Sequence, residues 1–454
     1  MQPRDLALFL LSRKAARKEP WGNPLDEVFQ KNPHLTPRDR AFVSHLVQGV
    51  WRWRGRLDWM IAQASNRPFQ RISPVVLNIL RLALYQICYM DRVPDSAAVN
   101  EAVLQVKAQG AARAAPFVNG LLRSLCRDRQ GIAFPDSKHA PVPSLAAVHS
   151  FPEWLVERWL RSQGLKETEA LLCALNRIPP LCVRANRLRM DRDGLLERLT
   201  AEGVTAEAFP GVPEALCIQG LRGRVDRLAS YEEGLFQVQD PGAEVAAHLL
   251  APAPGESVLD LCAGFGGKAT HLAELAKDQG RVVALDIQPK RLVHLRRSAQ
   301  RLGLRSIVAL AGDGTKDLGR LFQRPFDAIL VDAPCSGLGV LSRHPDGKWN
   351  RTEEDIPRLA SLQRALLQGA AEVLRAGGRL LYVTCTLTNE ENEDTARAFL
   401  ETHQDMTRVN LRERVPEWAL PFIDDQGFFR AVPHRHGTDG FFGALFEKKS
   451  GPGD

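Results

Sequence analysis

Residues 326–339 hold the combination of side chains that is best suited to chemistry in this sequence. An apolar run at 328–331, bounded by turn-forming residues, is typical of a buried strand in a parallel sheet. Asp332, Pro334 and Cys335 follow it, and open α/β sheets carry their chemistry at the carboxyl ends of such strands. A carboxylate three residues before a thiol, on a proline-stiffened turn, therefore predicts a catalytic loop. The plainer interpretation, a helix-capping aspartate beside an inert cysteine, does not explain the flanking pattern.

A glycine-rich turn at 262–268 follows a second strand pattern at 257–261. Such a turn lets the backbone approach a ligand and directs the N–H groups of the next helix toward it. Asp286 ends a further strand pattern and lies 20 residues after Gly266. A carboxylate at that place can accept hydrogen bonds from both ribose hydroxyls, so the pattern predicts a site for a nucleoside-containing cofactor.

Of two other kinds of nucleotide-binding motif, only one matches the same turn. Gly264, Gly266 and Ala269 satisfy the loose dinucleotide pattern, so an NAD-dependent enzyme remains an alternative. A phosphate-binding P-loop is excluded, because Cys262 stands where that motif needs its first glycine and Ala269 replaces its Ser or Thr.

Aspartates follow or end four successive strand patterns, and their number favours one kind of cofactor. These are Asp260, Asp286, Asp313 and Asp332. The position of Asp313 suits the exocyclic amine of adenine. An acidic edge of this kind repels a pyrophosphate but suits the sulfonium and ammonium groups of S-adenosylmethionine. Any one of these acids alone would be an ordinary cap, whereas the four together predict S-adenosylmethionine as the cofactor.

The residues that must position these groups alternate between strand and helix patterns from about 237 to the end of the chain. Strands are predicted at 257–261, 281–286, 307–311, 326–332 and 379–384, with a hairpin at 428–432 and 441–446. The strand at 379–384 delivers Cys385, and the helix before it, at 355–374, is predicted to end at Gly377 and Gly378. The pattern predicts a doubly wound, Rossmann-like domain over 237–454.

Three further segments precede that domain. Residues 1–130 show helical spacing of apolar residues throughout, for example at 76–87. Prolines 135, 141, 143 and 152 mark a linker at 131–151. Residues 152–236 combine helix patterns with short strands, such as 181–185, and predict a small α+β module without recognisable chemistry. The fold class is therefore multidomain, as expected for 454 residues.

The positive charge of the chain is concentrated near its beginning. Residues 1–130 contain 20 lysines and arginines against 10 acidic residues, although the whole chain carries only +7. This imbalance indicates a polyanionic partner for the helical segment. The tryptophans and arginines at 51–56 either form an RNA surface by stacking and phosphate contact, or pack in the core with the arginines extended outward. The sequence leaves these two interpretations equal.

The eight cysteines are scattered without a Cys-x-x-Cys pair. This argues against a zinc site or a disulfide framework and favours a reducing, cytoplasmic compartment. No apolar run is long enough to cross a membrane. Residues 1–18 are amphipathic and basic and are expected to form the first helix rather than a transit peptide. His434 and His436 lack further ligands nearby in the sequence, so no metal site is expected.

The motifs together resemble those of a known family. Residues 260–268, Asp286, Asp313, 332–337, 384–386 and 436–442 are similar to the successive motifs of bacterial ribosomal RNA cytosine-5 methyltransferases of the RsmB/NOP family. Residues 1–130 resemble the NusB-like helical RNA-binding domain. The resemblance covers nearly the whole chain. It implies methyl transfer from S-adenosylmethionine to carbon 5 of a cytosine in 16S ribosomal RNA, unassembled or partly assembled, with no obligatory protein partner.

The resemblance also assigns roles to individual residues. Attack falls to Cys385, product release to Cys335 and activation of the cytosine to Asp332. The implied cofactor site comprises Cys262, Ala263, Gly264, Phe265, Gly266, Gly267, Lys268, Asp286, Asp313 and Asp332. One departure is that Gly264 and Phe265 replace the family's Ala-Pro. From spacing alone either cysteine could attack, and the Pro-Cys pair would be the naive choice. The other six cysteines are expected to be packing residues.

The chemistry explains why two thiols and an acid are needed. A thiolate that adds at carbon 6 of cytosine converts the ring into an enamine, and carbon 5 can then attack a methyl sulfonium. An acid at nitrogen 3 assists, and burial should raise the pKa of Asp332 if it donates a proton. A cation such as Lys268 would help to ionise the attacking thiol. The sequence therefore predicts that Cys335 and Cys385 converge on one pyrimidine ring.

Two other classes of function remain. A nicotinamide oxidoreductase would explain the glycine turn but would leave Asp332, Cys335 and Cys385 without a role. A non-catalytic RNA assembly factor would not need to keep both cysteines.

Overall fold

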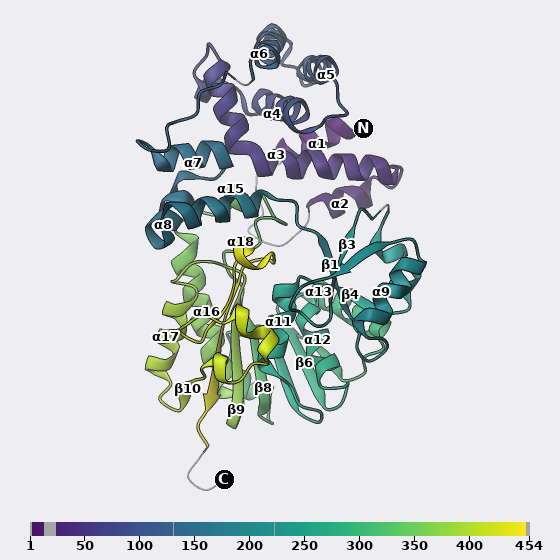
Figure 1. Ribbon diagram of the computed structural model, residues 1–454, viewed down its shortest axis with the longest axis vertical. Helices are drawn as coiled ribbons and strands as arrows, with labels where there is room; N and C mark the ends of the chain where they lie inside the picture. Colours follow the sequence, from purple (N-terminus) through teal and green to yellow (C-terminus); the bar gives the residue numbers. More distant parts are fainter. Residues whose placement is uncertain (1, 13–23, 130, 222, 451–454) are drawn as a thin grey trace. The chain divides into compact units, whose positions relative to one another are not determined.

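The computed structural model describes residues 2–12, 24–129, 131–221 and 223–450 (Figure 1). The chain forms two compact units. One comprises Met1–Asn176 with Arg343–Glu353, and the other comprises Arg177–Ser342 with Glu354–Asp454. In the described part of the chain, no helix is both long and apolar enough to cross a membrane.

The first unit is helical, as the sequence predicts, and its apolar residues form one continuous core from α1 to α6. Its elements are α1 (Pro3–Ser12), α2 (Pro24–Lys31), α3 (Pro37–Ala64), η1 (Phe69–Arg71), α4 (Pro74–Tyr89), α5 (Asp95–Ala108), η2 (Ala112–Ala114), α6 (Ala115–Arg127), α7 (Pro141–His149), α8 (Glu153–Asn176) and α15 (Gly347–Asn350). Helix α3 begins at a capping box, in which Thr36 and Asp39 satisfy each other's backbone N–H groups. Residues 13–18 of the predicted first helix lie outside the described residues.

The six residues at 51–56 are buried or partly buried within α3. The Trp53 ring stacks on Tyr89 with centroids 4.9 Å apart, and Arg52, which is 5% exposed, donates to backbone carbonyls at the end of α8. The structure therefore supports the packing of the tryptophans, but the expectation that the arginines extend outward is wrong for Arg52, which is buried and hydrogen-bonded. It does not present its tryptophans as a surface for stacked bases.

The predicted linker at 131–151 is wrong in part, because helix α7 lies within it. Leu145, Ala146 and Ala147 of this helix are buried. Proline is tolerated in the first turn of a helix, where the backbone N–H has no intrahelical acceptor. Pro141 and Pro143 occupy that turn, so they begin a helix here instead of marking a loop.

Residues 343–353 follow the catalytic loop in sequence but belong to the helical unit. Lys348 of α15 is fully buried, and its ammonium group donates to the carbonyls of Arg52 and Ser150 and to Oδ1 of Asn176 at 2.6–3.2 Å. Trp349 Nε1 donates to the carbonyl of Trp51 at 2.6 Å. Burial and the charge of Arg52 lower the pKa of Lys348 well below its usual value. Two side chains thus anchor this short segment.

The second unit begins with a small antiparallel sheet in the order β2-β3-β1-β4. Its elements are β1 (Leu181–Ala185), α9 (Arg192–Ala201), β2 (Thr205–Ala208), β3 (Ala215–Gln219), η3 (Val225–Arg227), α10 (Ala229–Glu232) and β4 (Phe236–Val238). The predicted strand at 181–185 is confirmed by β1. This sheet is the α+β module that the sequence predicts, although helix α8 at 153–176 belongs to the first unit.

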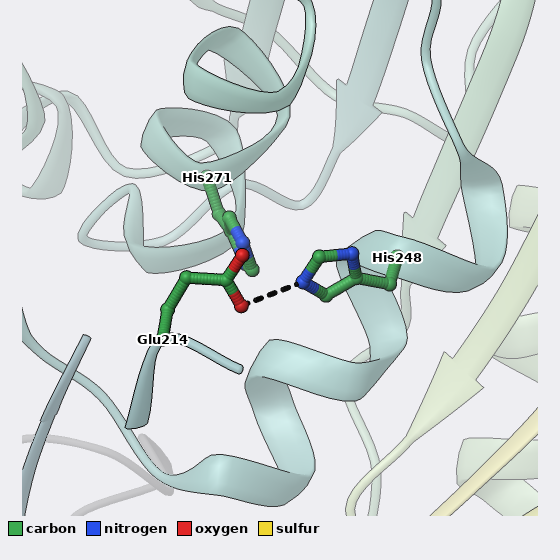
Figure 2. Close-up of side chains that lie close together, drawn as sticks. All are labelled: Glu214, His248 and His271. Carbon is green, nitrogen blue, oxygen red and sulfur yellow. Dashed lines mark hydrogen bonds and ion pairs between the residues drawn. The ribbon is translucent and has the colours of Figure 1, made fainter. Parts of the chain in front are cut away.

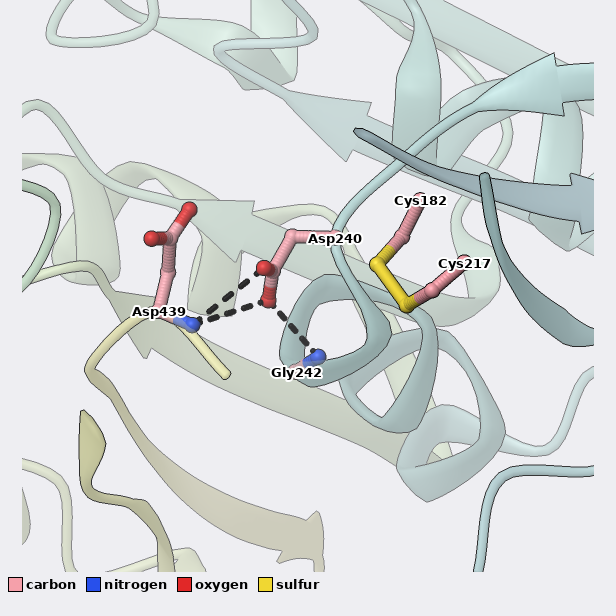
Figure 3. Close-up of a disulfide and its surroundings, with 5 residues drawn as sticks. All are labelled: Cys182, Cys217, Asp240, Gly242 and Asp439. Carbon is pink, nitrogen blue, oxygen red and sulfur yellow. Dashed lines mark hydrogen bonds between the residues drawn. A yellow bond between two sulfur atoms is a disulfide. The ribbon is translucent and has the colours of Figure 1, made fainter. Parts of the chain in front are cut away.

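Cys182 and Cys217 form a disulfide between β1 and β3 (Figure 3). The expectations that these two cysteines are free packing residues, and that the chain has no disulfide, are therefore wrong. The two residues are direct partners in the antiparallel register, which brings their side chains close enough to bond although 35 residues separate them in sequence. Spacing in the sequence does not reveal such a pair, because the register is set by the fold.

The remaining residues form a mixed sheet in the order β10-β12-β9-β8-β5-β6-β7, with β11 beside β12. Its strands are β5 (Ser257–Leu261), β6 (Arg281–Asp286), β7 (Ile307–Ala311), β8 (Phe326–Asp332), β9 (Leu374–Thr384), β10 (Met406–Arg408), β11 (Phe429–Ala431) and β12 (Phe441–Lys448). Strands β5 to β9 pair in parallel, and β12 is antiparallel to β9 and to β11. The doubly wound sheet and its closing hairpin are confirmed.

Both faces of this sheet are covered by helices (Figure 1). Alternate strand residues such as Val258 and Leu259 point into two different cores, one under α11–α13 and the other under α16 and α17. The helices are α11 (Pro241–Leu250), α12 (Gly267–Leu275), α13 (Pro289–Leu302), α14 (Leu318–Leu321), α16 (Asp355–Glu372), α17 (Glu393–Thr402) and α18 (Pro433–His436), with short turns η4 (Leu411–Glu413) and η5 (Glu417–Phe422). The predicted helix end at Gly377 and Gly378 is wrong, because β9 already begins at Leu374.

We expect Lys348→Ala to destabilise the helical unit by about 2–4 kcal/mol, since it removes a buried donor to three oxygens and leaves a cavity. Chemical denaturation of the full chain, followed by tryptophan fluorescence, measures this change. Lys31→Ala is the control, because its side chain is 71% exposed. Equal effects of the two substitutions would contradict the anchoring role of Lys348.

Candidate active site

The two predicted thiols meet at the carboxyl ends of β8 and β9. Cys335 follows β8, Cys385 follows β9, and their sulfur atoms lie 3.1 Å apart as free thiols. The backbone N–H of Cys385 also donates to the Cys335 sulfur at 3.3 Å. The structure thus confirms that these residues, fifty positions apart in sequence, converge at one place.

A buried carboxylate, Glu391, holds the two cysteine loops together. Its oxygens accept hydrogen bonds from the backbone N–H and hydroxyl of Ser336, which follows Cys335, at 2.8 and 2.5 Å. They also accept from Thr388 at 2.9 Å and from Gln363 at 3.0 Å, and the Ser336 and Thr386 hydroxyls lie 2.6 Å apart. Glu391 is fully buried. It therefore fixes the spacing of the loops that carry the sulfurs.

Sequence reasoning did not identify Glu391 or its partners. Residues 389–394 are a polar, acidic run, and such runs are usually solvated. The available signal was the set of short hydroxyl residues directly after each cysteine, Ser336 and Thr386. Those residue types bind a buried carboxylate well, because each supplies a donor with little volume.

Backbone contacts close the same loop from the other side. The N–H of Gly339 donates to the carbonyl of Cys385 at 3.0 Å, and the N–H of Gly440 donates to the carbonyl of Gly339 at 2.8 Å. A Cβ atom on Gly339 would lie 2.3 Å from the carbonyl oxygen of Gly440, so only glycine fits. Figure 3 shows the neighbouring Asp240, which accepts from the N–H groups of Gly242 and Asp439.

Asp332 lies beside the thiols as an ion pair with Lys268. Lys268 Nζ is 2.7 Å from Asp332 Oδ2, and the Asp332 side chain is 30% exposed. Asp332 is therefore not fully buried, in contrast to the expectation from the sequence. Instead, the ammonium group of Lys268, on α12, donates a hydrogen bond to the carboxylate. Because of the Asp332 charge, the pKa of Lys268 is raised despite its burial.

The Cys385 thiol is protonated in this arrangement. Its hydrogen bond with Cys335 raises its pKa well above the usual value, and burial and the charge of Asp332 act in the same direction. Lys268 acts in the opposite direction and lowers it. The predicted cation near the thiol is thus present, but the surrounding groups outweigh it. Ionisation of Cys385 requires a change around the site, such as entry of a substrate.

The glycine turn between β5 and α12 has the backbone conformation of a ligand-binding loop. Cys262, Gly264 and Gly266 all have positive φ, and for Cys262 the value of 72° is strained. A Cβ atom on Gly266 would lie 2.4 Å from the Leu295 side chain, so this position requires glycine. The Gly264 N–H donates to Asp286 Oδ2 at 2.8 Å, which links the turn to the acid at the end of β6.

The other predicted acids line the same edge of the sheet. Asp286 is nearly buried, and its second oxygen accepts from the Gln288 N–H at 2.8 Å. Asp313 accepts from the N–H and hydroxyl of Thr315, and these bonds lower its pKa. Asp260 is fully buried, and burial and the nearby charge of Asp332 raise its pKa well above its usual value. The environments at these strand ends thus act on carboxyl pKa values in opposite directions, upward for Asp260 and downward for Asp313.

Phe265, where the sequence departs from the family pattern, lies at the outer end of the turn and is 54% exposed. Its ring meets His294 edge-on at 5.8 Å, and the Arg291 guanidinium lies 5.9 Å from its centroid. An exposed aromatic ring next to the acids at these strand ends can cover the flat face of a purine. The structure thus brings the turn, the acids and the thiols to one edge of the sheet, which is suited to a cationic nucleoside cofactor and thiol chemistry.

Three family models match consecutive parts of the chain. A model described as 16S rRNA methyltransferase RsmB/F matches residues 247–447. The NusB family matches residues 1–127, and the ferredoxin-like domain of RsmF/B-like methyltransferases matches residues 151–223.

Curated relatives match over almost the whole chain. The probable ribosomal RNA small subunit methyltransferase B of Bacillus subtilis is 38% identical over 449 residues, which is 98% of each chain. The protein of the same name from Synechocystis is 39% identical over 98% of this chain and 99% of its own. The ribosomal RNA small subunit methyltransferase B of Escherichia coli strain 536 is 33% identical over 94% of this chain and 97% of its own.

Solved structures share the fold. The crystal structure of PH0851 covers 99% of both chains with a TM-score of 0.79 and 28% identity. A methyltransferase homologue from Pyrococcus horikoshii covers 69% of this chain and all of its own with a TM-score of 0.59 and 27% identity.

We expect alkylation of Cys385 by iodoacetamide to be slow at pH 7 and to accelerate toward alkaline pH, because only the thiolate reacts. Lys268→Met should raise the pKa of Cys385 further and shift this profile to still higher pH. At a fixed pH below the pKa, the rate should fall about tenfold for each unit by which the pKa rises. Peptide mapping by mass spectrometry separates Cys385 from Cys335 and from the exposed Cys173, which serves as the internal reference. A profile of Cys385 that coincides with that of Cys173 would contradict the raised pKa.

Proposed function

Because the chain belongs to the 16S rRNA methyltransferase RsmB/F family, whose cofactor is S-adenosylmethionine, we propose that it methylates carbon 5 of a cytosine in 16S rRNA through a covalent cysteine intermediate. The observation that carries this proposal is the 3.1 Å separation of the Cys335 and Cys385 sulfurs beside Asp332. A nicotinamide oxidoreductase would leave this pair of thiols without a function.

The residues of the glycine turn fit S-adenosylmethionine. Cys262, Ala263, Gly264, Phe265, Gly266, Gly267, Lys268, Asp286, Asp313 and Asp332 would hold it. Asp286 and Asp313 each retain acceptor capacity for ribose and adenine groups beyond the bonds that they already accept. When bound, this cofactor supplies an electrophilic methyl group. The acids at the strand ends favour its positive charge over the phosphates of a dinucleotide.

Cys385 is the proposed nucleophile. Its thiol first loses its proton to solvent. The thiolate then adds to carbon 6 of the cytosine, the carbon 5–carbon 6 double bond opens, and the electron pair of that bond becomes available for carbon 5 to bond to the methyl carbon. Proton delivery at nitrogen 3 stabilises the ring during this step. Asp332 is placed for that task, because a proton can pass from Lys268 Nζ, 2.7 Å away, through the Asp332 carboxylate to nitrogen 3, and it returns by the same route when the product is released.

Cys335 is the proposed base for release. Its thiolate removes the proton that carbon 5 still carries after methylation. The electron pair of that C–H bond restores the ring double bond and expels the Cys385 thiolate, and Cys335 is left protonated. The close approach of the two sulfurs lets one thiol receive the proton while the other departs. Glu391 supports both steps by holding the two loops in register.

The substrate base must leave its stack to reach these sulfurs, which favours a single-stranded or loop cytosine in unassembled or partly assembled 16S rRNA. The helical unit supplies a basic surface for the RNA backbone. Lys107 and Arg113 are exposed there. Arg113 belongs to a concave site that is lined by Ser73, Val76 and residues 110–114. Phosphate contacts of this kind make affinity depend strongly on salt.

Substitution of each thiol tests the proposed roles. Cys385→Ala should abolish methyl transfer to 16S rRNA fragments while S-adenosylmethionine binding by calorimetry persists. Cys335→Ala should accumulate a protein–RNA adduct that survives denaturing electrophoresis, because addition proceeds but release does not. Cys173→Ala is the control for loss of a cysteine elsewhere. If the adduct forms in Cys385→Ala instead, the two roles are exchanged.

Charge reversal at Lys107 and Arg113 tests the RNA surface. The double change to glutamate should weaken binding of a 16S rRNA fragment about tenfold or more at moderate salt. The slope of log affinity against log salt should become shallower by about the amount that two lost phosphate contacts account for. Filter binding across a salt series measures both quantities. Arg320→Glu, at another exposed position, is the control, and an equal loss there would contradict a specific role for the helical unit.

A further inference from the structure

A second cluster of buried polar side chains lies away from the thiols, within the second unit. Glu214 directly precedes β3, His248 is on α11 and His271 is on α12, and Figure 2 shows the three side chains directed toward one another. One ligand atom from each lies within 4.8 Å of the others. Glu214 and His271 are each 1% exposed, so the cluster is a built site and not a chance surface grouping.

His271 has no hydrogen-bond partner for either ring nitrogen among the described residues. An imidazole has one donor and one acceptor, or two donors when it is charged. Leaving these unsatisfied in a buried position costs about 1–3 kcal/mol for each group, and such groups in folded proteins usually have an unseen partner. Both ring nitrogens are therefore available to a ligand that the neighbouring Glu214 and His248 could share.

We propose that Glu214, His248 and His271 bind a divalent transition-metal ion of the zinc class. Two imidazoles and one carboxylate are a donor set that zinc uses with a fourth position left for water. His248 Nε2 and Glu214 Oε2 are 2.9 Å apart, whereas ligand atoms around a tetrahedral zinc ion are about 3.3 Å apart, given bond lengths of about 2.0 Å. If these two groups move apart by this small amount, the ion can take the place of the proton that they share.

The charges around the cluster determine how tightly such an ion is held. Arg187 donates to the other oxygen of Glu214 at 2.9 Å, and its side chain is 60% exposed, so it can withdraw into solvent. The nearby Arg184 is neutralised by Glu274 at 2.7 Å. Glu244, one turn before His248 on α11, is fully buried, and neither carboxylate oxygen has a hydrogen-bond partner among the described residues. Burial raises the pKa of this carboxyl group well above its usual value, so it does not offset the charge of a bound ion unless that ion itself favours its ionised form.

The ion would link the small antiparallel sheet to the methyltransferase sheet. Glu214 belongs to the former, whereas α11 and α12 cover the latter. His271 lies four residues after Gly267, where α12 begins at the cofactor turn. The site is thus structural, and it stabilises the helix that presents Lys268.

Equilibrium dialysis of the full-length, EDTA-treated protein against Zn²⁺, followed by metal analysis, tests the proposal. One zinc ion should bind per chain and raise the thermal unfolding temperature. Co²⁺ in its place should give the visible absorption of a tetrahedral site with nitrogen and oxygen ligands. His271→Phe keeps a buried ring but removes the ligand, and it should weaken binding by at least about 100-fold, since even partners outside the coordination shell are worth 10–100-fold.

Further variants separate this site from other donors. Glu214→Gln and His248→Ala should also abolish binding, whereas Arg187→Gln should tighten it several-fold by removing a competing cation. The double change of Cys335 and Cys385 to serine and the double change of His434 and His436 to alanine should leave binding intact. Circular dichroism in the absence of metal verifies that each variant is folded.

The proposal is overturned if the EDTA-treated protein binds no zinc. It is equally overturned if His271→Phe and His248→Ala bind it as tightly as the unaltered chain, or if only the cysteine change removes it. In the last case the Co²⁺ complex would show thiolate charge-transfer absorption, and the ion would belong to the thiols. None of these outcomes bears on the roles of Cys335 and Cys385 in methyl transfer, which are tested by the RNA adduct.

Discussion

One buried carboxylate determines the geometry on which the rest of the site depends. Glu391 accepts hydrogen bonds from groups that flank both cysteines, and a buried acid without these donors would be costly. The two loops can therefore satisfy it only when they lie side by side. Each loop leaves a different strand, β8 or β9, and these strands are neighbours in the sheet. The strand order brings the thiols near each other, and Glu391 sets the final distance.

The electrostatics of the same edge follow from an excess of acids over cations. Asp260, Asp286 and Asp332 lie at the ends of adjacent strands, Lys268 pairs with Asp332, and Arg291 lies 3.9 Å from Asp286. In this field a thiolate is disfavoured and a positively charged ligand is favoured. The charge of Asp332 thus favours a cationic cofactor and also adds to the rise in the pKa of Cys385 that the Cys335 hydrogen bond and burial cause.

The fold was largely predictable because its strands are short apolar runs that end in acids or glycines, and β5 to β8 lie where those runs occur. The thiols and the cofactor turn were predictable because few residue types suit their conformations and chemistry. Glu391 was not, since a carboxylate in a polar run looks solvated until tertiary contacts bury it. The Cys182–Cys217 bond could not be predicted, because strand register is not a local property. Helix α7 was missed for another reason, since prolines that begin a helix look the same in sequence as prolines in a loop.

The segment 343–353 makes the two units inseparable along the chain. The polypeptide passes from one unit to the other at residues 176–177, 342–343 and 353–354, so a single cut cannot release either unit intact. A fragment that starts at Arg177 would contain Lys348 and Trp349 but not the carbonyl groups that accept their hydrogen bonds. An exchange of residues 1–176 between relatives would therefore keep these contacts only if residues 343–353 were exchanged as well.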